Sequence, residues 1–221
     1  MTLRQQAARC GLVLLVVSLT LASADRAGVS AEPANQLVLE DFKHADTEGF
    51  PVNWEHESAR SGANARRAYQ VQSEQSLSLL AVKGADQRIK KKKIDWDPKA
   101  YPILSWRWRL KTAPTGADPI AVVYVSLDTD LLFIPVFTKY VWSVAKPEGA
   151  VIEGGIFSGT EIVIRSGPNP IGEWVQERVN VYEDFTRIHK HEPAERAWGI
   201  SLLGGPGVEI DFGPLIAVPS S

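Results

Sequence analysis

The 221-residue sequence has very little sulfur: one cysteine, Cys10, and one methionine at position 1. A single thiol cannot form an internal disulfide, and it excludes the paired-cysteine motifs of zinc and redox sites. The four histidines also lack the spacing of a zinc site; they are His44, His56, His189 and His191. The fold must therefore be stabilised by an apolar core, for which the chain is long enough.

The sequence also lacks an excess of basic residues. It has 24 Lys and Arg against 26 Asp and Glu, a formal net charge of −2 at pH 7. Proteins that bind nucleic acid usually present a basic face, so we do not expect nucleic acid as a partner. A nucleophile elbow is missing too, because Ser158 in Gly155–Gly159 falls one place late and no predicted helix follows it.

One long apolar run is present, and it lies at the start of the chain. Arg4 and Arg9 precede a nearly unbroken apolar stretch from Gly11 to Ala22, which is followed by the small-residue patterns Ala22-Ser23-Ala24 and Val29-Ser30-Ala31. This order predicts a secretory signal peptide. A membrane anchor is the alternative, but the run is short against the roughly 20 residues that span a bilayer.

We therefore expect residues 1–31 to be a signal peptide and leader, with cleavage after Ala24 or Ala31. Residues 32–221 are expected to form a single domain, periplasmic or secreted, with no transmembrane segment. Cleavage after Ala24 leaves 22 basic and 26 acidic residues and no cysteine.

Short β-patterned runs separated by Gly, Pro, Asp or Asn fill the remainder of the chain. Strands are predicted at Gln36–Phe42, Ala68–Gln72, Leu77–Val82, Arg88–Ile94, Ile103–Lys111, Ile120–Leu127, Lys139–Ala145, Thr160–Arg165, Trp174–Val181, Trp198–Leu203 and Val208–Phe212. One short helix is predicted near 183–190, where Phe185 and Ile188 stand three apart. The pattern predicts an all-β fold, a two-sheet antiparallel jelly-roll-like β-sandwich.

Alternation along the strands separates core residues from candidate ligand-binding residues. In Leu104–Leu110, Trp106 and Trp108 share the apolar face and are expected in the core, while two arginines occupy the other face. Similar alternation in two further strands adds aromatic, amide and guanidinium groups. The candidate ligand-binding residues, placed on one concave sheet, are Arg107, Arg109, Tyr124, Trp174, Arg178 and Asn180. Such groups suit a carbohydrate, which has apolar ring faces and hydroxyl rims.

Three other roles are considered for the chain: glycoside hydrolysis, calcium binding and a structural or protein-interaction role. A glycoside-active enzyme would need two carboxyl groups roughly 5–10 Å apart. The candidates are Glu173, Glu177, Glu183 and Asp184; Glu177 lies among apolar residues, where an ion pair with Arg178 or Arg109 is the structural alternative. Asp41 and Asp211 could share a structural Ca²⁺, since this ion prefers oxygen ligands. A purely structural or protein-interaction role with an envelope protein is the third alternative.

Several segments resemble an exported bacterial family, domain of unknown function 3047. They are Leu39–Phe42, Pro51–Trp54, Tyr101–Trp108, Val122–Val125, Tyr140–Trp142 and Trp174–Asp184. The resemblance implies export and a β-sandwich, but no activity. The chain departs from the family where Asp118 stands without an acidic neighbour, where Val122 replaces an arginine, and where Leu202–Val208 lacks acidic residues.

The two ends of the domain are similar to those of jelly-roll carbohydrate-binding modules. The opening strand carries Asp41 and Phe42, and the closing segment is Ile210–Leu215. This likeness implies that the closing strand pairs near the opening one. Together, these observations favour a non-catalytic binding or interaction domain for a carbohydrate or another polar envelope ligand.

Overall fold

The computed structural model describes residues 35–57, 59–85, 87–129, 134–154 and 159–220. The predicted signal peptide and nearly all of the leader lie outside the described residues, so export stays a prediction. Within the described ranges, no helix is long and apolar enough to cross a membrane.

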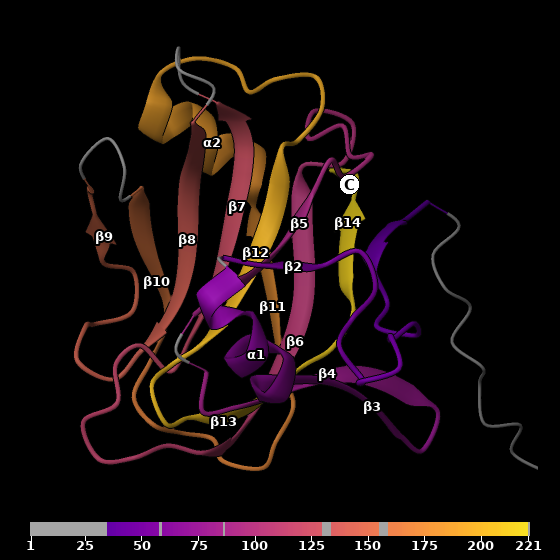
Figure 1. Ribbon diagram of the computed structural model, residues 1–221. Helices are drawn as coiled ribbons and strands as arrows, with labels where there is room; N and C mark the ends of the chain where they lie inside the picture. Colours follow the sequence, from indigo (N-terminus) through magenta and orange to yellow (C-terminus); the bar gives the residue numbers. More distant parts are fainter. Residues whose placement is uncertain (1–34, 58, 86, 130–133, 155–158, 221) are drawn as a thin grey trace, which may run out of the picture. The chain divides into compact units, whose positions relative to one another are not determined.

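Two seven-stranded sheets form the domain (Figure 1). The first contains, in spatial order, β1 (Leu37–Glu40), β14 (Leu215–Val218), β6 (Ile103–Thr112), β13 (Glu209–Phe212), β4 (Leu77–Lys83) and β3 (Tyr69–Glu74), while β11 (Val175–Asn180) also pairs with β6. The second contains β2 (Glu55–His56), β5 (Ile89–Lys92), β12 (Gly199–Gly204), β7 (Ala121–Thr129), β8 (Pro135–Ser143), β10 (Thr160–Ser166) and β9 (Val151–Ile152). The predicted two-sheet β-sandwich is thus confirmed.

Aromatic side chains from both sheets meet in the core. The ring of Trp106 lies 6.1 Å from that of Tyr140, and the ring of Trp108 lies 5.5 Å from that of Trp142. All four side chains are fully buried. Offset and edge-on aromatic pairs stabilise a core beyond the area they bury. The prediction that Trp106 and Trp108 are core residues is confirmed.

One strand pair departs from the expected antiparallel arrangement. β8 and β10 pair in parallel, whereas the other strand pairs of the described residues are antiparallel. A parallel pair requires a long crossover connection. The segment between Ser143 and Thr160, which contains β9, supplies it.

The predicted helix is present as α2 (Val181–His189) and begins two residues earlier than expected. The side chain of Asn180 caps it by accepting a hydrogen bond of 3.0 Å from the backbone N–H of Glu183. Lys190, with a left-handed φ of 61°, ends it. The buried hydroxyl of Tyr140 donates to Asp184, and this bond ties α2 to the second sheet.

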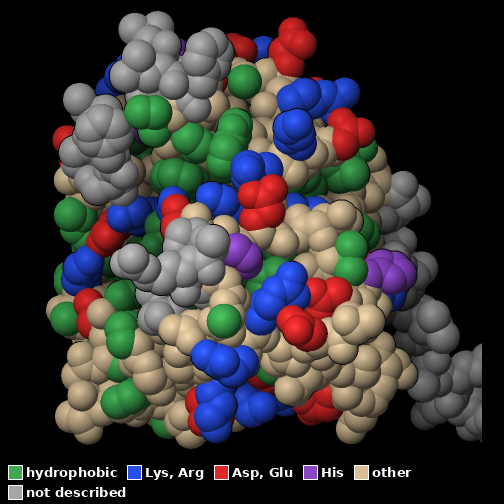
Figure 2. Space-filling model, in the orientation of Figure 1, with side chains coloured by type: hydrophobic (Ala, Val, Ile, Leu, Met, Phe, Trp, Pro, Cys, Tyr) green, Lys and Arg blue, Asp and Glu red, His purple; other side chains and the backbone are tan. Residues whose placement is uncertain are grey.

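A second helix, α1 (Ala59–Ala68), was not predicted, and it lies on the side of the domain seen in Figure 1. Figure 2 shows Lys and Arg side chains interspersed with Asp and Glu over this same side. Arg66 of α1, for example, forms an ion pair with Asp46. Mixed charge of this kind is typical of a solvated surface.

A candidate ligand-binding face on the first sheet

β6 and β11 place a row of polar side chains on the outer face of the first sheet. Gln176 lies directly opposite Arg107, and Arg178 lies opposite Ser105. Trp174 immediately precedes β11 and projects to the same side, since side chains alternate along a strand. We call this surface the Arg–Trp face; it consists of Arg107, Arg109, Trp174, Gln176 and Arg178.

The indole of Trp174 is held against two guanidinium groups. The Cζ atoms of Arg107 and Arg109 lie 4.8 and 4.7 Å from its ring centroid. Cations at this distance are attracted to the π-face of an aromatic ring. Trp174 is half-buried, so its ring has a fixed position while part of it remains open to solvent.

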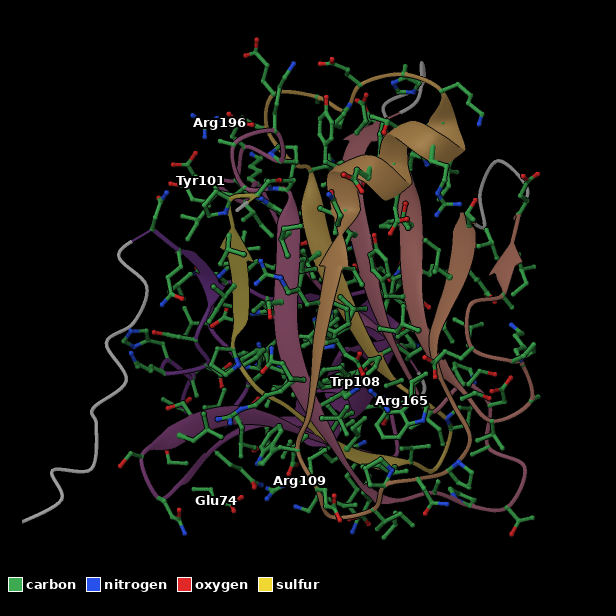
Figure 3. All side chains as sticks on the ribbon, turned by 180° about the vertical axis from the view of Figure 1, so that it is seen from behind. Glu74, Tyr101, Trp108, Arg109, Arg165 and Arg196 are labelled. Atoms are coloured by element: carbon green, nitrogen blue, oxygen red, sulfur yellow. The ribbon has the colours of Figure 1, made fainter. Side chains whose placement is uncertain are left out.

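Arg109 is fixed in turn by two carboxylates. Its Nε and Nη2 donate to Asp211 Oδ2 at 3.0 and 2.7 Å. Its Nη1 donates to Oε1 of Glu74, which is labelled beside it in Figure 3, at 3.1 Å. Hydrogen bonding to Glu74 and Asp211 raises the pKa of Arg109, against the effect of burial. The Arg109 hydrogen bond holds the pKa of Glu74 below its usual value. Arg109 is therefore a permanently charged, pre-positioned group.

Arg107 has a different environment. Its aliphatic stem lies on Gly213, where an added Cβ atom would come within 2.7 Å of Arg107 Cγ. The Gly213 N–H donates to the Arg107 carbonyl oxygen at 2.8 Å. Among the described residues, neither Arg107 nor Arg178 forms an ion pair or a side-chain hydrogen bond. Their guanidinium donors are available to a ligand.

A hollow of about 540 Å³ lies beside Trp174, between the Arg–Trp face and the turn that joins β3 to β4. Gln75, with a left-handed φ of 49°, is in this turn. The hollow is lined by Glu74, Gln75, Ser76, Leu77, Arg107, Arg109 and Trp174. It is large enough to hold a small polar ligand.

Four of the six predicted ligand-binding residues share this face, and two do not. Tyr124 belongs to β7 in the second sheet, where the Arg88 guanidinium lies 5.0 Å from its ring centroid. Burial raises the pKa of Tyr124. The side chain of Asn180 caps α2. The expectation that all six lie on one sheet is wrong, because alternation reveals which side of a strand a residue occupies but not which sheet the strand joins.

Glu177 faces the core rather than the Arg–Trp face. It is 8 % exposed, and its Oε1 accepts hydrogen bonds from Trp108 Nε1 at 3.0 Å and from Arg165 Nε at 2.7 Å. Arg165 comes from β10, so this ion pair joins the two sheets. The predicted partners, Arg178 and Arg109, are wrong, since Arg178 points to the opposite side and Arg109 pairs with Asp211 and Glu74.

The other candidate carboxylates are placed separately. Glu183 is exposed in the first turn of α2, where a negative charge favours the helix dipole. Asp184 accepts from Tyr140 and pairs with Arg187. Glu173 is exposed just before Trp174.

The proposed calcium ligands do not share a site. β1 pairs with β14 and not with β13, the strand that carries Asp211. Asp211 is already paired with Arg109 and lies 3.7 Å from Lys111 Nζ, while Asp41 pairs with Lys43. Within the described part of the chain, no group of three or more acidic, histidine or cysteine residues could hold a metal ion. The related expectation that the closing strand pairs near the opening one agrees with the β1–β14 pair.

Comparison with solved structures finds β-rich domains at low sequence identity. The family 11 carbohydrate-binding module of the cellulosomal cellulase Lic26A-Cel5E of Clostridium thermocellum is 10 % identical, with a TM-score of 0.44 over 86 % of this chain and 97 % of that chain. The solution structure of CtCBM11 is 11 % identical, with a TM-score of 0.46 over 86 % and 99 %. The K3 cleaved adhesin domain of Lys-gingipain from Porphyromonas gingivalis w83 is 13 % identical, with a TM-score of 0.44 over 83 % and 99 %.

Sequence comparison finds a match to a family model over part of the chain. No curated protein matches the chain. A family model described as "Protein of unknown function (DUF3047)" matches residues 135–203, from the start of β8 into β12. This match confirms, for that segment, the resemblance to domain of unknown function 3047 that the sequence motifs indicate.

Proposed function

We propose that this domain is a non-catalytic binding module that holds a carbohydrate on the Arg–Trp face. The observation that carries the proposal is the Trp174 ring, fixed by two guanidinium groups beside a hollow of about 540 Å³. An aromatic ring provides a platform for the apolar face of a sugar, and neighbouring donors and acceptors bind its hydroxyl groups. Export, as predicted, would place this face in the periplasm or outside the cell.

The rigidity of the face supports binding. Asp211 is 1 % exposed and holds Arg109, which in turn contacts Trp174. Groups that are fixed before the ligand arrives lose little conformational entropy on binding. The likeness to solved carbohydrate-binding modules is consistent with this function but is not needed for it.

The carboxylates of this face do not favour glycoside hydrolysis. A hydrolase needs one carboxyl group with a raised pKa to act as a general acid. The Arg109 hydrogen bond instead lowers the pKa of Glu74, and Asp211 is bound to the same guanidinium. These acids position Arg109 rather than supply a proton.

A glycan array tests the proposal. The intact domain is expected to bind at least one class of oligosaccharide, and Trp174→Ala is expected to weaken that binding roughly tenfold or more, since a stacked aromatic contributes about 1–3 kcal/mol. Trp174→Phe, which retains an aromatic face, is the matched control and should keep most of the affinity.

Thermal unfolding of both variants should stay close to that of the parent, because Trp174 is only half-buried. Absence of binding to the whole array would exclude carbohydrate recognition. Glycan binding that survives Trp174→Ala would show that the glycan binds outside the Arg–Trp face. Specific capture of an envelope protein through this face, without glycan, would instead support the interaction alternative.

A further inference from the structure

We infer that the ligand is an acidic glycan whose carboxylate groups bind to the guanidinium groups of Arg107 and Arg178. This inference rests on the proposed function and specifies its ligand class. Three observations carry it: the unbalanced charge of these two arginines, their contrast with the other arginines of the domain, and the fixed amide of Gln176 beside them.

The Arg–Trp face has more positive than negative charge. Arg109 is balanced by Asp211 and Glu74, and Lys111 also lies near Asp211. Arg107 and Arg178 have no acidic partner among the residues that the structure describes. The β6–β11 register makes them diagonal neighbours, about 7–8 Å apart at the backbone. The Arg107 guanidinium lies against Trp174, and Arg178 is exposed further along the same face. The face therefore offers an anionic ligand two positive charges that no carboxylate of the described residues balances.

The other arginines whose side chains the structure describes show that this situation is exceptional. Six of them form ion pairs with carboxylates: Arg66, Arg88, Arg109, Arg165, Arg187 and Arg196. Arg67 donates to the side chain of Asn64. The whole chain has more acidic than basic residues, so counter-charges are not scarce. Moreover, Arg107 is half-buried, and partial burial of an unbalanced charge opposes folding. A bound anion would offset that cost.

The amide oxygen of Gln176 can accept a hydrogen bond from a ligand hydroxyl group on the same face as the two arginines. Its Nε2 donates to Ser105 Oγ at 2.7 Å and to the Trp106 carbonyl oxygen at 2.9 Å. These bonds fix the amide, so its Oε1 is left to accept a hydrogen bond. A guanidinium binds a carboxylate through two parallel hydrogen bonds. A ligand with a carboxylate beside a hydroxyl, as in a uronic acid, satisfies both groups.

The same strand indicates that the ligand is an oligosaccharide. Trp174, just before β11, and Arg178, within it, are four residues apart, about 13 Å along the extended chain. One sugar ring cannot cover both positions. We therefore expect one ring to stack on Trp174 beside Arg107 and a second, acidic ring to bind near Arg178.

The test uses a panel of neutral, uronate-containing and sulfated oligosaccharides, followed by calorimetry with the uronate that binds best and with its carboxyl-reduced form. The parent domain is expected to bind the uronate at least roughly tenfold more tightly than the reduced form, since a charged hydrogen bond contributes about 1.5–3 kcal/mol. Arg107→Gln and Arg178→Gln should each weaken uronate binding by a similar factor. Arg107→Lys should retain only part of the affinity, because an ammonium group lacks the planar fork.

Arg196→Gln is the matched control. It removes the same charge from an exposed ion pair at the end of the domain opposite Arg109 (Figure 3) and should change the affinity less than twofold. If the parent binds only neutral members, or if the arginine variants bind the uronate as the control does, the inference is wrong while the proposed function stands. A preference for sulfated members alone would also overturn the uronate assignment. No binding to any member would overturn both.

Discussion

The two faces of β6 have opposite chemistry although they alternate within the same ten residues. On the inner face, Trp106 and Trp108 are at most 1 % exposed and pack against the second sheet. On the outer face, Arg107 and Arg109 contact Trp174 and line a hollow. The comparison teaches that stability and ligand binding are separated by side-chain direction, since successive residues of a strand point to opposite sides.

Substitution on the two faces should give opposite results, and this is the largest expected effect. Trp108→Ala should lower the free energy of unfolding by about 3–5 kcal/mol, because it leaves a cavity in the core and removes one of the two hydrogen bonds that Glu177 accepts. Arg107→Ala should change it by about 0.5 kcal/mol or less, since no ion pair is lost. Denaturant unfolding measures both. Equal losses in the two variants would contradict the separation of the faces.

The buried ion pair between the sheets gives the next largest effect. Arg165→Met leaves Glu177 in the core with only the Trp108 N–H, and should cost about 2–3 kcal/mol of unfolding free energy. Adding Glu177→Gln should recover part of this loss, because a neutral amide can still accept from Trp108. Arg196→Met, which breaks an exposed pair, should cost about 0.5 kcal/mol or less. A double variant no more stable than Arg165→Met would show that the charge of Glu177 is not the cause.

The smallest expected effect concerns Glu74 on the outer face. The pKa of Glu74 is lower in the folded state than its ordinary value of 4.5. The ion pair with Arg109 therefore stabilises the folded state fully above pH 4.5. This contribution is lost as the pH falls through the lower pKa of the folded state. An NMR titration of the Glu74 carboxyl carbon should show a midpoint below 4.5 in the parent and a return toward 4.5 in Arg109→Gln. An unchanged midpoint in that variant would show that Arg109 does not cause the shift.

Much of the sandwich could be predicted because its strands alternate clearly. Every predicted strand overlaps an observed one. The missed strands β2 and β9 contain two residues each, too few to show a period, and β14 follows the turn-forming Gly213-Pro214 pair. α1 contains Gly62 and lacks an apolar stripe, so its packing on the sheet rather than its sequence determines it.

The candidate site could be predicted only as far as side-chain direction. Alternation identified Arg107, Arg109, Trp174 and Arg178, because neighbouring strands of one sheet carry them. Strand order decides the remaining contacts, and alternation does not reveal it. Tyr124 therefore appeared to share the face, and the partners Asp211 and Glu74 of Arg109 were missed.

The alternation within β6 also constrains how such a site could change during evolution or in design. Insertion or deletion of a single residue in the strand would turn the arginines inward and the tryptophans outward, because a shift of one residue exchanges the two faces. New specificity on the Arg–Trp face must therefore arise by point substitution at fixed length. Libraries built on this domain should randomise Arg107, Gln176 and Arg178 while leaving strand length and the inward residues untouched.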